Sequence, residues 1–169
     1  MDPAELRLPT LAVPVRLAVV GGEVAPAELH VADAPRAGRS DLLDDLGALL
    51  DDDEPFVPVR IAGHIRLIGK QAISWVAVKR RDQSRPIPVG VETWPEEPSL
   101  VTTLYDRMHH VELALVGGTK IIGQLMDSLP ADRPRTIDHL NRAGRFLRLW
   151  TEEEHFLVNK GQIVWVSEV

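Results

Sequence analysis

The chain has 169 residues, of which 44% are hydrophobic and 26% charged, and its formal net charge is −6 at pH 7. These fractions are ordinary for a soluble globular protein. The negative net charge disfavours nucleic-acid binding, because the electrostatic field of the whole protein repels phosphate groups. The sequence contains no cysteine, which excludes disulfides, thiolate metal sites and cysteine nucleophiles.

The N-terminal region favours a cytoplasmic protein. Residues 1–5 lack the basic start of a secretory signal. The apolar stretch 11–20 is interrupted by Pro14 and Arg16 and is far shorter than the ~20 residues that span a bilayer. We therefore expect cytoplasmic localisation and no membrane insertion.

Two segments of the chain recur in the same order. Residues 15–22 and 111–118 are identical at six of eight positions, 96 residues apart. Residues 67–76 and 157–166, 90 residues apart, share Leu, Lys, Ile, Trp and Val in place. Two ordered matches predict an internal duplication. We place the copies at residues 15–78 and 111–169, joined by a proline-rich linker at residues 79–110.

The first copy predicts a strand that reaches a tight hairpin turn at Gly21-Gly22, followed by a second strand. A helix is expected at residues 40–50, with Ser40 as its N-cap. Its leucines fall on one helical face. Three strands follow, at residues 56–61, 65–68 and 72–78.

The second copy repeats this order. A strand leads to a turn at Gly117-Gly118, and residues 119–126 predict the second strand. A shorter helix is expected at residues 136–143, with Ile137 and Leu140 facing inward and Gly144 ending it. The remaining strands are expected at residues 145–150, 155–158 and 162–166.

The order β-β-helix-β-β-β resembles the Sm-like (Sm/LSm) small barrels. Residues 118–125 are similar to the family's first signature, in which a glycine, here Gly123, lets the second strand bend sharply. Residues 157–163 and 67–73 resemble the short strand–turn–strand of the second signature. The resemblance implies a mainly β protein with two tandem Sm-like/SH3-like five-stranded bent barrels. The helix between strands two and three is atypical, because the family usually places its helix before strand one.

Trp75 and Trp165 occupy equivalent positions in the last strand of each copy. Ile73 and Ile163 share their faces, so we expect both indoles to pack in the core or between the copies. A platform for stacking bases would need exposed rings flanked by Lys or Arg, and neither strand offers these residues.

Opposite charges gather at matching places in the two copies. The second copy holds a cluster of arginines. The planar guanidinium of arginine is favoured at sites that bind carboxylate or phosphate, because it can donate two hydrogen bonds to either group. They are Arg133, Arg135, Arg142, Arg145 and Arg148. The first copy holds an acidic run that includes Asp51, Asp52 and Asp53. This reversal predicts that the arginines contact an acidic surface, either that run in a neighbouring molecule or an acidic partner; a solvated helix face is the alternative.

The sequence shows no constellation typical of catalysis. No two of the six histidines have the helical spacing of a zinc site with a matching carboxylate, and no phosphate-binding loop or nucleophile elbow is present. We expect no enzyme activity, no cofactor and no metal.

The favoured hypothesis is a non-enzymatic adaptor or assembly protein that acts through a protein partner or self-association. The alternative is an RNA-binding module that uses the arginine cluster, which the acidic balance disfavours. An enzyme or nucleotide sensor ranks third.

Overall fold

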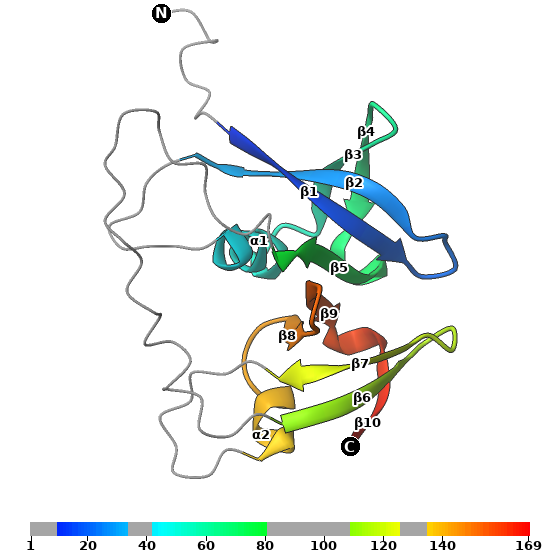
Figure 1. The fold of residues 1–169 in the computed structure, drawn as a ribbon. Helices are drawn as coiled ribbons and strands as arrows, with labels where there is room; N and C mark the ends of the chain where they lie inside the picture. The colour runs from blue at the N-terminus through cyan, green and yellow to red at the C-terminus, as the bar shows by residue number, and fades with distance from the viewer. Residues whose placement is uncertain (1–9, 34–41, 81–108, 126–134) are drawn as a thin grey trace, which may run out of the picture.

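The structure, a computed structural model, describes residues 10–33, 42–80, 109–125 and 135–169. Ten strands in these ranges form one antiparallel sheet in the order β10-β6-β7-β8-β9-β5-β1-β2-β3-β4 (Figure 1). The expected mainly β fold class with short helices is therefore confirmed. Most of the linker, Ser40 and Arg133 lie outside the described residues.

The elements fall into two halves in chain order. The first half comprises β1 (Thr10–Val19), β2 (Ala25–Ala32), α1 (Leu42–Asp51), β3 (Phe56–Ile61), β4 (His64–Gly69), the 3-10 turn η2 (Lys70–Ala72) and β5 (Ile73–Lys79). The second half comprises β6 (His109–Leu115), β7 (Lys120–Leu125), α2 (Thr136–Leu140), β8 (Phe146–Trp150), β9 (Glu154–Asn159), the 3-10 turn η5 (Lys160–Gln162) and β10 (Ile163–Glu168).

The two halves have the same strand pairing. The order β5-β1-β2-β3-β4 in the first half corresponds to β10-β6-β7-β8-β9 in the second. Leu17 lies opposite Val76, and the equivalent Leu113 lies opposite Val166. An irregularity in register follows at the same place in both pairs of strands. The separations of 96 and 90 residues found in the sequence therefore describe equivalent positions in the sheet.

Glycines make the hairpin turns that open each half. Gly21 has a φ of 70°, and Gly117 and Gly118 have φ values of 95° and 88°. Side chains with a Cβ rarely adopt these angles, whereas glycine does so at little cost. The predicted tight turns are therefore present at both places.

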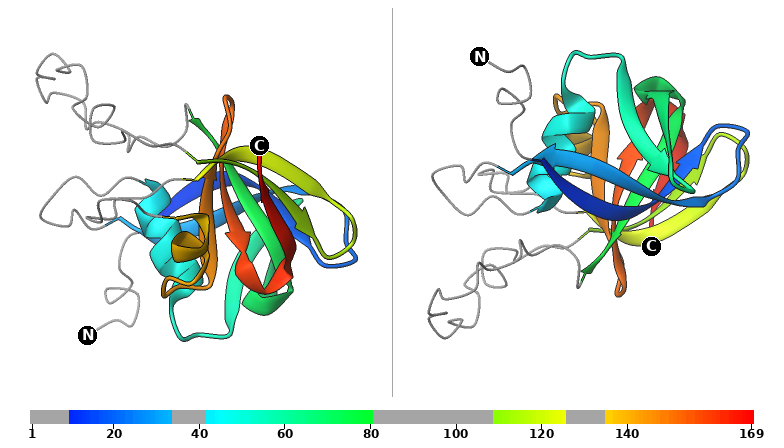
Figure 2. Two further views of the ribbon diagram at one scale, coloured as in Figure 1. Left: turned by 90° about the horizontal axis from the view of Figure 1, so that it is seen from below. Right: turned by 90° about the horizontal axis from the view of Figure 1, so that it is seen from above.

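The predicted pair of barrels differs from the observed arrangement. The ten strands form one continuous sheet, because β5 of the first half pairs directly with β9 of the second. This sheet is not closed, and β10 and β4 are its two outer strands. Figure 2 shows that the two hairpins, β1–β2 and β6–β7, project to the same side, with α1 and α2 on the opposite side. The halves are therefore stacked in the same orientation.

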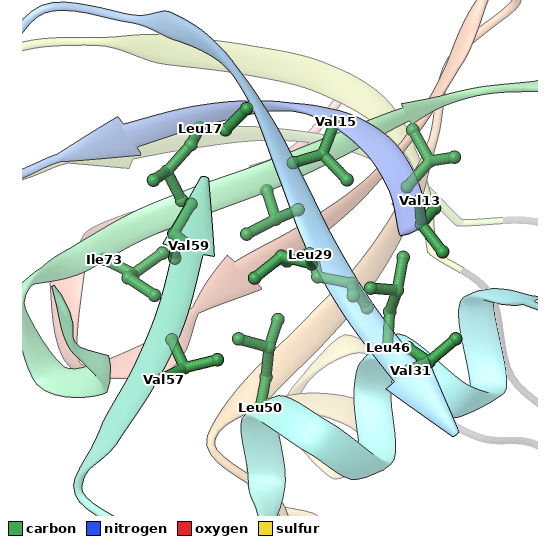
Figure 3. Packing of buried hydrophobic residues seen from close by; sticks show 14 of the residues in the cluster. Val13, Val15, Leu17, Leu29, Val31, Leu46, Leu50, Val57, Val59 and Ile73 are labelled. Carbon is green, nitrogen blue, oxygen red and sulfur yellow. The ribbon is translucent and has the colours of Figure 1, made fainter. Parts of the chain in front are cut away.

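A first hydrophobic core lies between α1 and the strands of the first half (Figure 3). Leu42, Leu43, Leu46 and Leu50 of α1 are buried, as the single leucine face predicts. Figure 3 shows Leu46 and Leu50 directed toward Leu29 of β2 and its neighbours on the sheet.

The second half has a smaller helix and its own core. The helix α2 covers only Thr136–Leu140, so the predicted extension to residue 143 is wrong. Ile137, expected to face inward, is exposed, whereas Leu140 packs against the core. A helix of barely more than one turn presents few side chains to one face, so the strands supply most of this core.

Candidate interaction surface

The two halves are joined by a ladder between their edge strands. The strands β5 and β9 pair in antiparallel register, from Trp75 opposite Val158 to Lys79 opposite Glu154. All residues of β5 except Lys79 are buried. We call this β5–β9 contact the internal junction.

Side chains from each half complete the core of the other across the internal junction. Phe146 and Leu157 belong to the first core, although they come from β8 and β9. Trp75 of β5 belongs to the second core, and its ring meets that of Phe156 edge-on with 5.3 Å between centroids. Neither core is complete without the other half.

Polar contacts reinforce the internal junction. The buried side-chain amide of Asn159 donates to the carbonyl oxygen of Ile73 at 2.8 Å, and it also lies within hydrogen-bond distance of the Lys70 and Gln71 carbonyls. The Arg16 guanidinium pairs with the Glu154 carboxylate through two hydrogen bonds, one of them 2.8 Å long. This hydrogen bond raises the pKa of Arg16.

Acidic residues of the first half also contact the second half within the same chain. The Asp51 carboxylate accepts hydrogen bonds from the backbone N–H groups of Arg145 and Phe146, at 2.6 and 3.1 Å. Arg148 donates to Asp44 at 2.5 Å. Acidic residues of α1 thus meet the start and middle of β8, beside the internal junction.

The other residues of the predicted site are dispersed. Arg135 pairs with Asp138 three residues later, at 3.3 Å. Asp52 pairs with the buried ammonium of Lys70, and this hydrogen bond lowers the pKa of Asp52. The side chains of Arg142, Arg145 and Asp53 are exposed. The described arginines therefore lie just before α2, in the loop after it and in β8, and Arg142 and Arg148 line one pocket together with Asp51 and Lys160.

A cleft of about 660 Å³ beside Trp150 is the second candidate site. Its lining includes Arg80, His110 and the acidic residues at 152–154, so it mixes both signs of charge. Trp150, which also lines the cleft, stacks on the buried His155 ring with 4.3 Å between centroids. Burial and, secondarily, the nearby positive charges of Arg80 and Arg148 lower the pKa of His155 to about 4. His155 is therefore neutral at pH 7 and serves as a packing ring.

The outer edges of the sheet, β4 and β10, expose large apolar side chains. Phe56 of β3, next to the edge strand, and Leu67 of β4 are 57% and 72% exposed, whereas their equivalents Phe146 and Leu157 at the internal junction are 7% and 1% exposed. Trp165 of β10 is 42% exposed, whereas Trp75 is 5% exposed. The expectation of a buried indole is therefore confirmed for Trp75 and wrong for Trp165.

The repeat in the sequence contained a signal for these edge residues. The separation of 90 residues matches Phe56 with Phe146 and Leu67 with Leu157. It could not show which member of each pair would have a neighbouring half, because strand pairing between the copies is a long-range contact.

Comparisons with known proteins add no identification: no family model, no curated protein and no solved structure matches this chain. Among the described residues, no helix is both long enough and apolar enough to cross a bilayer. The same residues hold no group of three or more His, Asp or Glu side chains placed to bind a metal ion.

Proposed function

We propose that this protein is a non-enzymatic adaptor or assembly protein, built from two Sm-like five-stranded units, that binds other proteins through the outer edges of its sheet. The observation that carries the proposal is the exposure of large apolar side chains along β4 and β10.

Strand edges of this kind are suited to binding another strand. An edge strand presents unpaired N–H and C=O groups. A monomeric protein usually prevents other strands from pairing with them by placing charged residues, proline or a bulge on the edge. All residues of β4 from His64 to Leu67 are exposed, and Ile65 and Leu67 are among them. Main-chain pairing would give a partner affinity, and side-chain contacts would give specificity.

The alternative, an RNA-binding module, depends on the arginine cluster. Arg135 and Arg148 already face Asp138 and Asp44, which reduces the positive charge available to phosphate. The net charge of −6 acts in the same direction. The surface therefore favours protein partners over nucleic acid.

The test is capture of partners from the native host by the full chain and its variants. Leu67→Lys and Trp165→Lys place a charge on each edge, and Val24→Lys is the matched control. Val24 is exposed in the first hairpin, and its equivalent in the second half is already Lys120. We expect proteins retained by the wild type and by Val24→Lys to be lost from at least one edge variant.

A different outcome would contradict this function. If neither edge variant changes the captured proteins, and Arg142→Glu with Arg145→Glu instead abolishes binding of labelled RNA at ~0.15 M salt, the RNA-binding alternative replaces the adaptor. Exposed charges act over about 8 Å at that ionic strength, so a genuine phosphate contact would also weaken steeply as salt is added.

A further inference from the structure

The cleft beside Trp150 is lined by charged side chains of both signs and lies where the two halves meet. Arg80 directly follows β5 of the first half, and Glu152 and Glu153 belong to the turn between β8 and β9 of the second. We propose that this cleft binds the carboxyl-terminal segment of a partner protein: Arg80 binds the terminal carboxylate, and Glu152 and Glu153 bind a basic side chain that precedes it. None of the described residues that line the cleft belongs to β4 or β10, so this site is additional to the sheet edges of the proposed function.

The cleft continues into a second opening along the internal junction. This opening has a volume of about 580 Å³ and shares Arg80, Glu153 and Glu154 with the cleft. Figure 2 shows the end of β5 beside the turn between β8 and β9, and the Arg80 backbone N–H donates to the Glu153 carbonyl oxygen at 3.0 Å. The two openings therefore form one groove, and volumes of this size are suited to a ligand as large as a short peptide.

The charges that line the groove divide into a paired set and an unpaired set. Arg16 and Glu154 pair with each other across the internal junction. Within the described part of the chain, the Arg80 guanidinium and the Glu152 and Glu153 carboxylates form no ion pair, although they line the same cleft. Charges of opposite sign that do not neutralise each other are complementary to a ligand that carries both signs.

The Arg80 guanidinium is held in place by groups that leave its charge unneutralised. Its Nη1 donates to the Glu152 carbonyl oxygen at 3.3 Å, and its Cζ lies 5.4 Å from the centroid of the Trp150 ring. Trp150 is in turn stacked on the buried His155 ring. A guanidinium can donate two parallel hydrogen bonds to a carboxylate. Because this one is already oriented, it loses little conformational entropy on binding.

A second donor and an apolar wall complete the cleft. The indole Nε1 of Trp150 is buried and has no acceptor among the residues that the structure describes. A buried donor without an acceptor is unfavourable, so a ligand oxygen that reaches this group would add to the affinity. Ile122, which is 61% exposed, and Phe156 line the same cleft and offer apolar contact to a side chain near the end of the peptide.

This set of groups fits the end of a peptide chain better than other ligands. Glu152 and Glu153 would repel the phosphates of a nucleotide. The Trp150 ring already contacts both His155 and Arg80, which leaves little of its surface for stacking a base. A chain end carries its carboxylate on the backbone, so binding it orders fewer rotatable bonds than binding an acidic side chain.

Fluorescence anisotropy with two forms of one labelled peptide tests the site. The peptide ends in Lys-Ala-Leu and carries either a free carboxylate or a terminal amide. The wild type should bind the free acid with a dissociation constant below ~1 mM. It should bind the amide at least about tenfold more weakly, because the amide loses a charge-assisted hydrogen bond. Equal affinity for the two forms would overturn the proposal without any change to the protein.

Arg80→Gln tests which residue binds the carboxylate. This variant should bind the free acid at least about tenfold more weakly than the wild type. It should no longer distinguish the acid from the amide, because both changes remove the same contact. Arg66→Gln removes an exposed arginine of β4 outside the cleft, so it is the matched control and should bind like the wild type. If Arg80→Gln fails to fold, Arg80→Lys replaces it: the charge without the planar fork should bind more weakly and still prefer the acid.

Glu152→Gln combined with Glu153→Gln tests the contact with the basic side chain. The wild type should prefer the lysine peptide over one with glutamine at that place by about two- to fivefold, the effect of exposed ion pairs. The double variant should lose this preference. Glu23→Gln, in the first hairpin and outside the cleft, should keep it.

Two further outcomes would overturn the proposal. One is a wild-type chain that does not bind the free acid at millimolar concentration. The other is an Arg80→Gln variant that binds and distinguishes the two peptides as the wild type does. Neither outcome concerns the sheet edges, so capture of partners that depends on Leu67 or Trp165 would leave the adaptor function standing.

Discussion

Trp75 and Trp165 are equivalent residues whose surroundings differ. Trp75 is enclosed by the internal junction, where Phe156 meets it edge-on and the Arg16 guanidinium lies 5.3 Å from the ring centroid. Trp165 lies on the outer edge strand with the Lys120 ammonium 5.1 Å from its ring centroid. The same residue type therefore has a structural role in one half and is available for binding in the other.

The two tryptophans should respond differently to truncation. Trp75→Ala should lower the free energy of unfolding by about 3–5 kcal/mol, because it removes a buried aromatic ring. Trp165→Ala should cost less than about 1 kcal/mol in dilute solution, because much of its indole is already in water. Chemical denaturation of both variants checks this prediction, and equal losses would contradict it.

His155 should make the stability of the protein depend on pH. Its pKa is lowered to about 4 in the folded chain, whereas an unfolded histidine titrates near ~6.5. The unfolded state therefore binds more protons, so the stabilisation is complete above pH ~6.5 and is lost as the pH falls toward 4. The loss over this window is on the order of 3 kcal/mol.

The measurement for His155 is the free energy of unfolding between pH 7 and pH 4, for the wild type and for His155→Phe. The phenyl ring keeps the stacking on Trp150 but cannot bind a proton. The difference between the two proteins should grow as the pH falls. Parallel pH profiles would show that His155 does not titrate as its burial implies.

At the scale of the elements, Gly123 lets β7 approach β8 closely. A Cβ at this position would lie 2.3 Å from the carbonyl oxygen of Trp150 and 2.9 Å from Leu149 Cγ. The first of these contacts is with backbone, which cannot rotate away. The glycine that the Sm-like resemblance singled out in the second strand is therefore required by the packing of its neighbour.

Gly123→Ala should therefore destabilise the protein strongly, by about 3 kcal/mol or more, because the two strands must separate. The equivalent position in β2 is Ala27, which already holds a Cβ. The control Ala27→Gly should cost only about 1 kcal/mol, from backbone entropy and lost packing. Thermal denaturation compares the two variants, and a Gly123→Ala variant as stable as the wild type would contradict the close approach of β7 and β8.

At the scale of the whole molecule, the halves depend on each other because each core takes side chains from both. The second core includes Ala18, Trp75 and Ala77 from the first half. A solitary unit of about 60 residues buries only about 60% of the surface that its unfolded chain exposes, so it is marginally stable. The internal junction therefore acts as a structural element as well as a connection.

Residues 111–169 expressed alone should be markedly less stable than the full chain, which should unfold in one cooperative transition. Truncation exposes Phe146, Phe156 and Leu157, each of which is buried at the internal junction. Circular dichroism and calorimetry of the fragment and the full chain check this prediction. Two separate transitions in the full chain would show that the halves are independent domains.

The sequence by itself determined the content of each half. Local alternation, the Gly-Gly turns and the leucine face of α1 predicted nearly every strand and the first helix, and the spacing of the repeat located equivalent positions in the two copies. These features depend on neighbours within a few residues or within one hairpin. Local patterns of this kind therefore indicate secondary structure without knowledge of the rest of the fold.

Only the tertiary structure decided which copies of these features are buried. Leu67 and Leu157 occupy equivalent positions in the repeat, yet one is exposed and the other is in the core. Likewise, Asp51 reaches the backbone of β8 within the same chain. The physical reason is that burial depends on the strand lying alongside: β9 pairs with β5 from distant sequence, whereas β4 ends the sheet.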